Sequence, residues 1–259
     1  MGSLTVAGSG MTVAGQVTDE AKSAIESAEK LFHLVQNVLI HRWLEQVNSS
    51  AESLYDSYGH GKRRSVTYEE IVERILAPVR EGRRVCAVFY GHPGVFASPA
   101  HEAIHRARRE GHSARMLPGI SAEDCLIADL GFDPGEHGCQ SFEATDFLVR
   151  RRVFDPTSAV LLWQIGGIGI SDFRNQESWN PLGVGILART LAETYGEDHE
   201  VVVYEAAVYP IAGPKIHRCR LADLAAAPVT IASTLLVLPL PDRPIDRELL
   251  ARLAEPAAE

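Results

Sequence analysis

The chain has 259 residues, enough for one large domain or two modest ones with buried cores. Hydrophobic residues make up 46% of it and charged residues 23%, a composition typical of a globular protein in water. Its formal net charge of −9 argues against nucleic acid as a partner, because proteins that bind phosphate backbones carry basic surfaces.

Cysteine spacing and hydropathy point to the cytoplasm. The four cysteines are widely spaced and form no Cys-x-x-Cys pair, as expected of thiols in a reducing compartment. No apolar stretch approaches the ~20 residues that a membrane helix needs, and the N-terminus lacks the pattern of a signal peptide. We therefore expect a cytoplasmic protein without a membrane partner.

Strand and helix patterns alternate in the first half of the chain. Thr18 is the expected cap of the first helix, and Thr67 is expected to open the third. The strand predicted at 85–90 is apolar throughout, which suits a parallel sheet buried on both faces. The predicted strands of this half are 4–7, 31–35, 85–90 and 114–117, and the predicted helices are 18–30, 38–47, 68–80 and 99–110.

The pattern restarts after Pro118 and Gly119. Ser121 is the expected cap of a helix, and the amino terminus of that helix could face a ligand. The regular alternation predicts an α/β architecture of two lobes, residues 1–118 and 119–259, with a cleft between them. The predicted strands of this half are 159–164, 200–204 and 231–238, and the predicted helices are 181–195 and 245–253.

The turn after the strand at 85–90 is the most informative feature of the sequence. Tyr90 ends the strand and is followed by a Gly-His-Pro-Gly turn. Gly91 and Gly94 allow the backbone to approach a ligand closely, and Pro93 stiffens the bend. Ligands of open α/β sheets lie at the carboxyl ends of strands, where this turn would sit. An ordinary strand-to-helix turn is the alternative.

Three motifs resemble known signatures but depart from them. The segment 101–105 has the His-Glu-x-x-His spacing of zinc proteases, but position 108 is Arg and His112 comes one residue too late for a third ligand, so we expect no metal. Gly8 and Gly10 follow a strand as in a dinucleotide loop, yet the third glycine is missing. The glycines at 166–169 lack the Gly-Lys-Ser/Thr that would follow in a nucleotide triphosphate site.

A polar and aromatic cluster precedes the third predicted helix. Tyr55 and Tyr58 are three residues apart and would share one face of a helical turn. Arg64 precedes Tyr68 by four residues, across the expected junction between loop and helix. The simpler alternative is a surface loop whose tyrosines pack over an apolar rim.

Several segments together resemble the borosin peptide α-N-methyltransferases. These enzymes methylate backbone amides of ribosomally made peptides and belong to the wider tetrapyrrole-methylase superfamily. The resemblance implies a two-lobed tetrapyrrole-methylase-like fold with S-adenosylmethionine in the inter-lobe cleft and S-adenosylhomocysteine as product. The matching segments span nearly the whole chain in the expected order: 2–10, 64–69, 89–96, 114–124, 141–146, 161–164 and 233–235.

The resemblance also implies roles for individual residues. The catalytic polar set would be Tyr58, Arg64, Tyr68 and Tyr90, supported by Tyr55. The wider superfamily commonly has an acidic residue where His92 stands here, which favours borosin enzymes over porphyrin methylases. Together with the glycine loops and the helix cap above, the expected cofactor contacts are Gly8, Gly10, Tyr90, His92, Val95, Phe96, Ser121, Ala122, Gln164, Ala206, Ser233 and Thr234.

The resemblance further implies a mechanism. Methylating an amide is difficult because the nitrogen lone pair is delocalised into the carbonyl group. Tyr68 would serve as the base, with Arg64 stabilising its phenolate. Tyr58 and Tyr90 would donate hydrogen bonds to the carbonyl oxygen, as in an oxyanion hole, although the roles of the three tyrosines could be exchanged.

Fungal members of that group carry their substrate as a C-terminal extension and methylate it within a dimer. This chain ends soon after Leu253, so we expect the split type, which acts in trans on a separate precursor peptide. The resemblance implies a homodimer, with a heterotetramer that includes the precursor as a further option. Two alternatives stay open: a methyltransferase acting on a tetrapyrrole or another small molecule, and a non-catalytic peptide-binding module.

Overall fold

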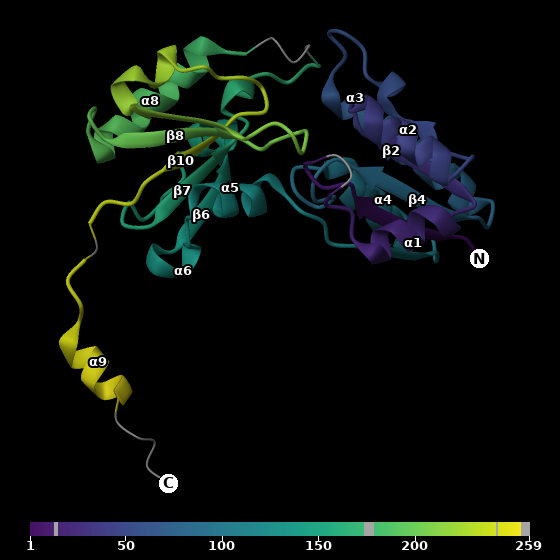
Figure 1. The fold of residues 1–259 in the computed structure, drawn as a ribbon, viewed down its shortest axis with the longest axis horizontal. Coiled ribbons are helices and arrows are strands. Elements are labelled where there is room, and N and C mark those ends of the chain that lie inside the picture. Colours follow the sequence, from purple (N-terminus) through teal and green to yellow (C-terminus); the bar gives the residue numbers. More distant parts are fainter. Residues whose placement is uncertain (13–14, 174–178, 242, 255–259) are drawn as a thin grey trace.

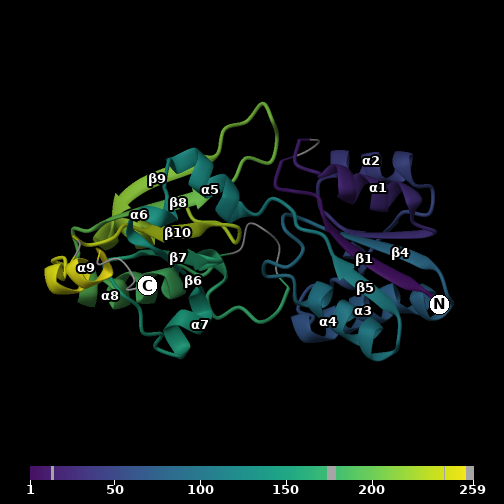
Figure 2. The ribbon, with the colours of Figure 1, turned by 90° about the horizontal axis from the view of Figure 1, so that it is seen from below.

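Two sheets with helices packed on them form two lobes that lie side by side (Figures 1 and 2). The computed structural model describes residues 1–12, 15–173, 179–241 and 243–254. The predicted division at 118/119 falls between the last strand of the first sheet and the first helix of the second lobe. None of the helices in these ranges is long and apolar enough to cross a membrane.

The N-terminal lobe contains a parallel sheet with the strand order β3-β2-β4-β1-β5. Because parallel strands end at the same edge, the turns after β1 and β4 lie together at the edge that faces the second lobe (Figure 2). The strands are β1 (Ser3–Gly8), β2 (Lys30–Leu34), β3 (Glu52–Ser53), β4 (Arg84–Phe89) and β5 (Ser113–Met116).

Helices cover both faces of this sheet. The helices α1 (Asp19–Ser27) and α2 (Val38–Val47) pack on one face, and α3 (Arg64–Arg80) and α4 (Ser98–Arg109) pack on the other (Figure 2). The alternating sides of the strands supply the two apolar cores, because neighbouring side chains of a strand point to opposite faces.

The start of α3 corrects the sequence prediction. Thr18 caps α1 as predicted, by accepting a hydrogen bond from the Ala21 N–H. Thr67 does not open α3; the helix begins at Arg64, and Thr67 is buried inside it. The reason is a contact with the other lobe, since the Arg64 N–H donates to the Ser171 carbonyl oxygen at 3.3 Å and needs no side-chain cap.

The C-terminal lobe contains a mixed sheet with the order β6-β7-β10-β8-β9. Only β6 and β7 pair in parallel; β10 is antiparallel to both of its neighbours, and β8 and β9 form an antiparallel pair. The sequence indicates neither edge strand, because β6 and the largely exposed, basic β9 have no apolar run. The strands are β6 (Cys139–Glu143), β7 (Ala159–Trp163), β8 (Glu200–Glu205), β9 (Lys215–Arg220) and β10 (Thr234–Val237).

The helices of the second lobe also pack on two faces. The helix α5 (Ala122–Leu130) covers one face of the sheet, and α7 (Ala144–Val149) and α8 (Pro181–Tyr195) cover the other. The short α6 (Pro134–His137) lies beside β6, and α9 (Arg247–Ala254) extends away from the body of the molecule (Figure 1). Short 3-10 turns occur at Tyr55–Ser57, Ile165–Gly167 and Leu221–Ala226.

Candidate active site

The two glycine loops at the carboxyl edge of the first sheet form one unit. Gly10 and Gly91 exchange backbone hydrogen bonds, at 3.3 Å from the Gly10 N–H and 3.0 Å from the Gly91 N–H. A Cβ atom on Gly8 would lie 2.3 Å from the Gly91 oxygen, so only glycine permits this approach. The glycines therefore serve to bring the β1 and β4 loops into direct backbone contact.

Histidines hold the turn that follows Gly91. The His92 Nδ1 accepts a hydrogen bond from the Gly94 N–H at 2.9 Å, and the His101 Nε2 lies 2.8 Å from the Gly94 oxygen. His101, the first residue of the motif at 101–105, is thus hydrogen-bonded to the backbone of this turn. Within the described ranges, no group of three or more His, Cys, Asp or Glu residues could hold a metal ion.

The resemblance implies an S-adenosylmethionine pocket at this turn, and for such a pocket we expect His101→Ala to weaken binding about fivefold, because losing one hydrogen bond of about 1 kcal/mol releases the Gly94 peptide. Calorimetric titration with S-adenosylhomocysteine measures this change. His105→Ala is the matched control, since His105 lies one turn further along α4 and is exposed. Equal affinities of both variants and the wild type would show that the contact with Gly94 is dispensable.

The Tyr58 phenol lies in an aromatic cluster built from both lobes. Its ring centroid is 5.3 Å from that of Tyr55 and 5.0 Å from that of Phe173. The backbone keeps Phe173 there, because its N–H donates to the Lys62 oxygen at 3.1 Å and its own oxygen accepts from the Gly61 N–H. Phe173 was not predicted to belong to the site, because no sequence motif marks it.

The structure brings three members of the predicted catalytic set together. Arg64 and Tyr68 lie one turn apart on α3 rather than across a loop-to-helix junction, and the Tyr68 and Tyr58 hydroxyls are hydrogen-bonded. Burial and the neighbouring Tyr68 raise the pKa of Tyr58 far above its usual value, although the Arg64 guanidinium opposes the rise. Tyr58 is therefore a neutral phenol, able to donate a hydrogen bond.

Tyr90, the fourth member of that set, has different neighbours. Burial, together with Cys125 and Glu205 of the second lobe, raises the pKa of Tyr90 to about 12. Tyr90 is thus also a hydrogen-bond donor at neutral pH. The catalytic residues predicted from sequence accordingly form two groups, the cluster around Tyr58 and the single phenol of Tyr90.

Strained backbone marks two of the predicted cofactor contacts. Of the described residues other than glycine, only Phe96, Arg151 and Gln164 have a positive φ, with φ values of 52°, 47° and 57°. Phe96 and Gln164 lie on opposite lobes, and the Phe96 ring packs 5.6 Å from that of Trp163, which precedes Gln164. Such strain collects at functional sites. Val95 and Phe96 are exposed apolar side chains beside this strained backbone, which suits contact with an aromatic ligand.

At other predicted contacts the side chains are engaged within the protein. Ser121 caps α5 within a capping box, in which its hydroxyl donates to the Asp124 carboxylate at 2.6 Å. Ser233 and Thr234 are buried, and the Ser233 hydroxyl donates to Glu205. A Cβ atom on Gly166 would lie 2.2 Å from the Thr230 oxygen, so the glycine motif at 166–169 serves packing against the loop that carries Ser233.

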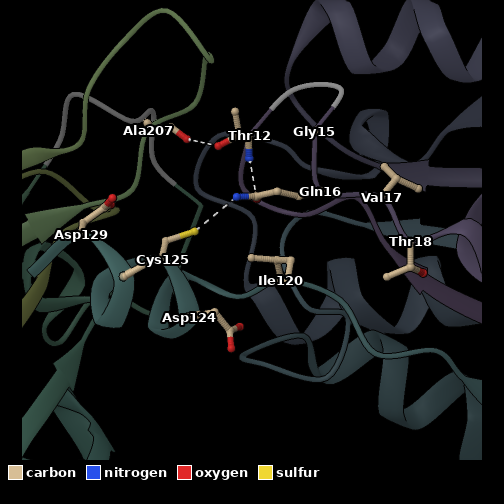
Figure 3. A pocket seen from close by; sticks show the side chains of 11 residues that line it. Thr12, Gly15, Gln16, Val17, Thr18, Ile120, Asp124, Cys125, Asp129 and Ala207 are labelled. Carbon is tan, nitrogen blue, oxygen red and sulfur yellow. Dashed lines mark hydrogen bonds between the residues drawn. The ribbon is translucent and has the colours of Figure 1, made fainter. Parts of the chain in front are cut away.

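A cavity of about 510 Å³ lies between the segment before α1 and the helix α5 (Figure 3). Two hydrogen bonds between the lobes border it: the Thr12 hydroxyl donates to the Ala207 oxygen at 2.9 Å, and the Gln16 amide donates to the Cys125 sulfur at 3.6 Å. No predicted site residue lines the cavity among those described. Its lining is Thr12, Gly15, Gln16, Val17, Thr18, Ile120, Asp124, Cys125, Ala128, Asp129 and Ala207.

Comparison with known proteins identifies relatives of the chain. The tetrapyrrole (corrin/porphyrin) methylases match residues 3–225. The chain is 46% identical, over 86% of its length and 53% of the relative, to the methyltransferase/ribosomally synthesized cyclic peptide gymnopeptides precursor of Gymnopus fusipes. It is 38% identical, over 98% of its length and 63% of the relative, to a methyltransferase/ribosomally synthesized type I borosin cyclic peptide precursor of Serendipita vermifera. The chain therefore spans little more than half the length of these relatives.

Solved structures share the fold. Uroporphyrin-III-C-methyltransferase from Thermus thermophilus has a TM-score of 0.65 at 20% identity, with 92% of each chain covered. Cobalt precorrin-4 methyltransferase has a TM-score of 0.63 at 18% identity, covering 91% of this chain and 94% of the other. The α/β fold with two sheets and the resemblance to borosin enzymes are thereby confirmed.

Proposed function

The chain belongs to the tetrapyrrole (corrin/porphyrin) methylase family, and we propose that it is an S-adenosylmethionine-dependent enzyme that methylates backbone amide nitrogens of a ribosomally made peptide. The observation that carries the proposal is the identity of 38–46% to proteins whose names join a methyltransferase to a peptide precursor. The hydrogen-bonded phenols beside a guanidinium support it, because an amide needs a base and a stabilised oxygen before its nitrogen can react.

We place the cofactor where the two lobes face each other, at the residues expected to contact it. Tyr90, His92, Val95 and Phe96 would hold it from the first lobe. The residues of the second lobe that would hold it are Ser121, Ala122, Gln164, Ala206, Ser233 and Thr234. When bound, S-adenosylmethionine supplies an electrophilic methyl group on a positively charged sulfur. The protein contributes orientation and electrostatic stabilisation.

We propose that the Tyr68 oxygen accepts the proton of the reacting amide. Arg64, one turn before Tyr68 on α3, would offset the negative charge that develops on this oxygen, and the neutral Tyr58 phenol would donate a hydrogen bond to it. A phenol has one proton to donate, so while Tyr58 donates to Tyr68, Tyr90 is left to donate to the carbonyl oxygen of the substrate. In the balanced reaction the amide N–H bond and the sulfur–methyl bond break, the nitrogen–methyl bond forms, and the product cofactor is a neutral thioether.

The partners belong to the same proposal. We propose that the precursor peptide is a separate chain and that the enzyme is a homodimer, with a heterotetramer as its complex with the precursor. We also propose that it works in the cytoplasm, in keeping with its four free thiols. Size-exclusion chromatography with light scattering, with and without the peptide, measures the assembly directly.

The test is a mass measurement. The purified protein is incubated with S-adenosylmethionine and either synthetic precursor segments of the fungal relatives or a short precursor encoded next to its gene. We expect the peptide mass to rise in steps of one methyl group, with the methyl groups on backbone nitrogens in tandem mass spectra. Methylation of uroporphyrinogen instead of peptide would favour the small-molecule alternative. Binding of S-adenosylhomocysteine without any turnover would favour a binding module.

A further inference from the structure

Glu205 is a largely buried acid among the proposed cofactor contacts. It is the last residue of β8 and directly precedes Ala206. Its neighbour Tyr204 pairs with Thr234 on β10, which places Glu205 next to the loop that carries Ser233. Its side chain is only 12% exposed. No sequence motif marks Glu205.

Three groups donate hydrogen bonds to the Glu205 carboxylate. One oxygen accepts from the Thr230 and Ser233 hydroxyls, each at 2.6 Å, and the other accepts from the Lys215 ammonium at 2.8 Å. Burial acts to raise the pKa of this carboxyl, but the hydrogen bonds from Lys215, Ser233 and Thr230 outweigh it and lower the pKa. Glu205 therefore carries a negative charge at neutral pH.

The negative charge is only partly balanced by Lys215. The Lys215 side chain is 75% exposed, so water screens its positive charge far more than the charge of the carboxylate. The effect of Glu205 extends to the other lobe, because the carboxylate helps to raise the pKa of Tyr90. The Glu205 carboxylate therefore contributes a negative potential to the space between Tyr90 and the Ser233 loop.

We propose that Glu205 makes the cofactor site prefer the cationic sulfonium of the methyl donor over the neutral thioether of the product. The inference rests on the proposed function, since it concerns the same cofactor. Methyl transfer removes the positive charge of the sulfur, so an adjacent carboxylate favours entry of the donor and release of the product. Glu205 also holds Thr230 and Ser233 in place, and that positioning alone would affect both forms of the cofactor equally.

Glu205→Gln separates the two effects, because the amide keeps an acceptor oxygen for the hydroxyls and removes the charge. Calorimetry would give the dissociation constants of S-adenosylmethionine, of S-adenosylhomocysteine and of sinefungin, an analogue with an ammonium group near the sulfonium position. We expect affinity for the two cationic ligands to fall about tenfold, equivalent to about 1.4 kcal/mol, and affinity for S-adenosylhomocysteine to change by less than about twofold.

Two further variants complete the test. Lys215→Met removes the opposing charge and should raise the preference for S-adenosylmethionine over S-adenosylhomocysteine by about two- to threefold. Glu200→Gln is the matched control: Glu200 lies on the same strand, is 53% exposed and pairs with Arg218, so its loss should leave all three affinities unchanged.

Each outcome decides one question. Equal weakening of all three ligands by Glu205→Gln would show a purely structural role and overturn the inference. If Glu205→Gln does not fold, Lys215→Met decides alone, and an unchanged preference in that variant would likewise overturn it. A wild-type protein that binds neither S-adenosylmethionine nor S-adenosylhomocysteine would instead contradict the proposed function.

Discussion

Replacing Tyr68 by Phe should lower the rate of peptide methylation about a thousandfold and leave the dissociation constant of the cofactor within about twofold of wild type. Phenylalanine keeps the ring on α3 but has no oxygen to accept the amide proton. The hydrogen bond between the Tyr68 and Tyr58 hydroxyls is lost as well, but Tyr58 stays packed between Tyr55 and Phe173. The effect should therefore appear in kcat, measured by single-turnover mass spectrometry, rather than in binding.

Tyr55→Phe is the matched control for this prediction. The Tyr55 ring belongs to the same cluster, 5.3 Å from Tyr58, but its hydroxyl is hydrogen-bonded to Gln36. Removing that hydroxyl should change the rate by less than about threefold. Full turnover in Tyr68→Phe would rule out Tyr68 as the base. Comparable losses in both variants would mean that the cluster acts through packing.

Residues with a local signal were predictable from the sequence. The apolar run that ends at Tyr90 predicted a strand, which the structure contains as β4. The glycines after it predicted a close approach to a ligand; Gly91 contacts Gly10 in the structure, and the approach to a ligand stays a prediction. Ser121 followed by Asp124 predicted a helix cap, and both hydrogen bonds of the capping box are present. These features depend on neighbours within a few residues, so one sequence carries the information.

Features created by contact between distant segments were not predictable. Phe173 completes the Tyr58 cluster from the other lobe. The start of α3 is set by the backbone oxygen of Ser171, which accepts from the Arg64 N–H, and not by the side chain of a capping Ser or Thr. Glu200 and Glu205 look alike in the sequence of β8, yet only Glu205 accepts hydrogen bonds from the Thr230 and Ser233 hydroxyls. What separates the two acids is the packing of residues 230–233 against Gly166, which no short-range pattern reveals.

The second large effect concerns stability in acid and depends on His33. This residue lies on β2 and is 1% exposed, and neither ring nitrogen has a hydrogen-bond partner among the described residues. Its ring centroid is 4.7 Å from that of His41 on α2, which in turn pairs with Glu45. Burial, and then the charge of His41, lower the pKa of His33 from 6.5 to about 4.

The direction of the pH effect follows from where the proton binds. Below pH 6.5 the unfolded chain protonates His33, whereas the folded chain does not do so until about pH 4, so folding becomes less favourable as the pH falls between these values. At 1.36 kcal/mol per pH unit the free energy of unfolding should drop by about 3 kcal/mol over this range because of His33 alone.

Urea unfolding of wild type and His33→Leu between pH 7 and 4.5 measures this loss of stability. The variant should lose about 2 to 3 kcal/mol less than wild type, whereas His217→Gln, an exposed control on β9, should follow the wild-type curve. Parallel curves for wild type and His33→Leu would show that His33 is protonated in the folded protein, and that the two unpaired ring nitrogens do not limit its stability in acid.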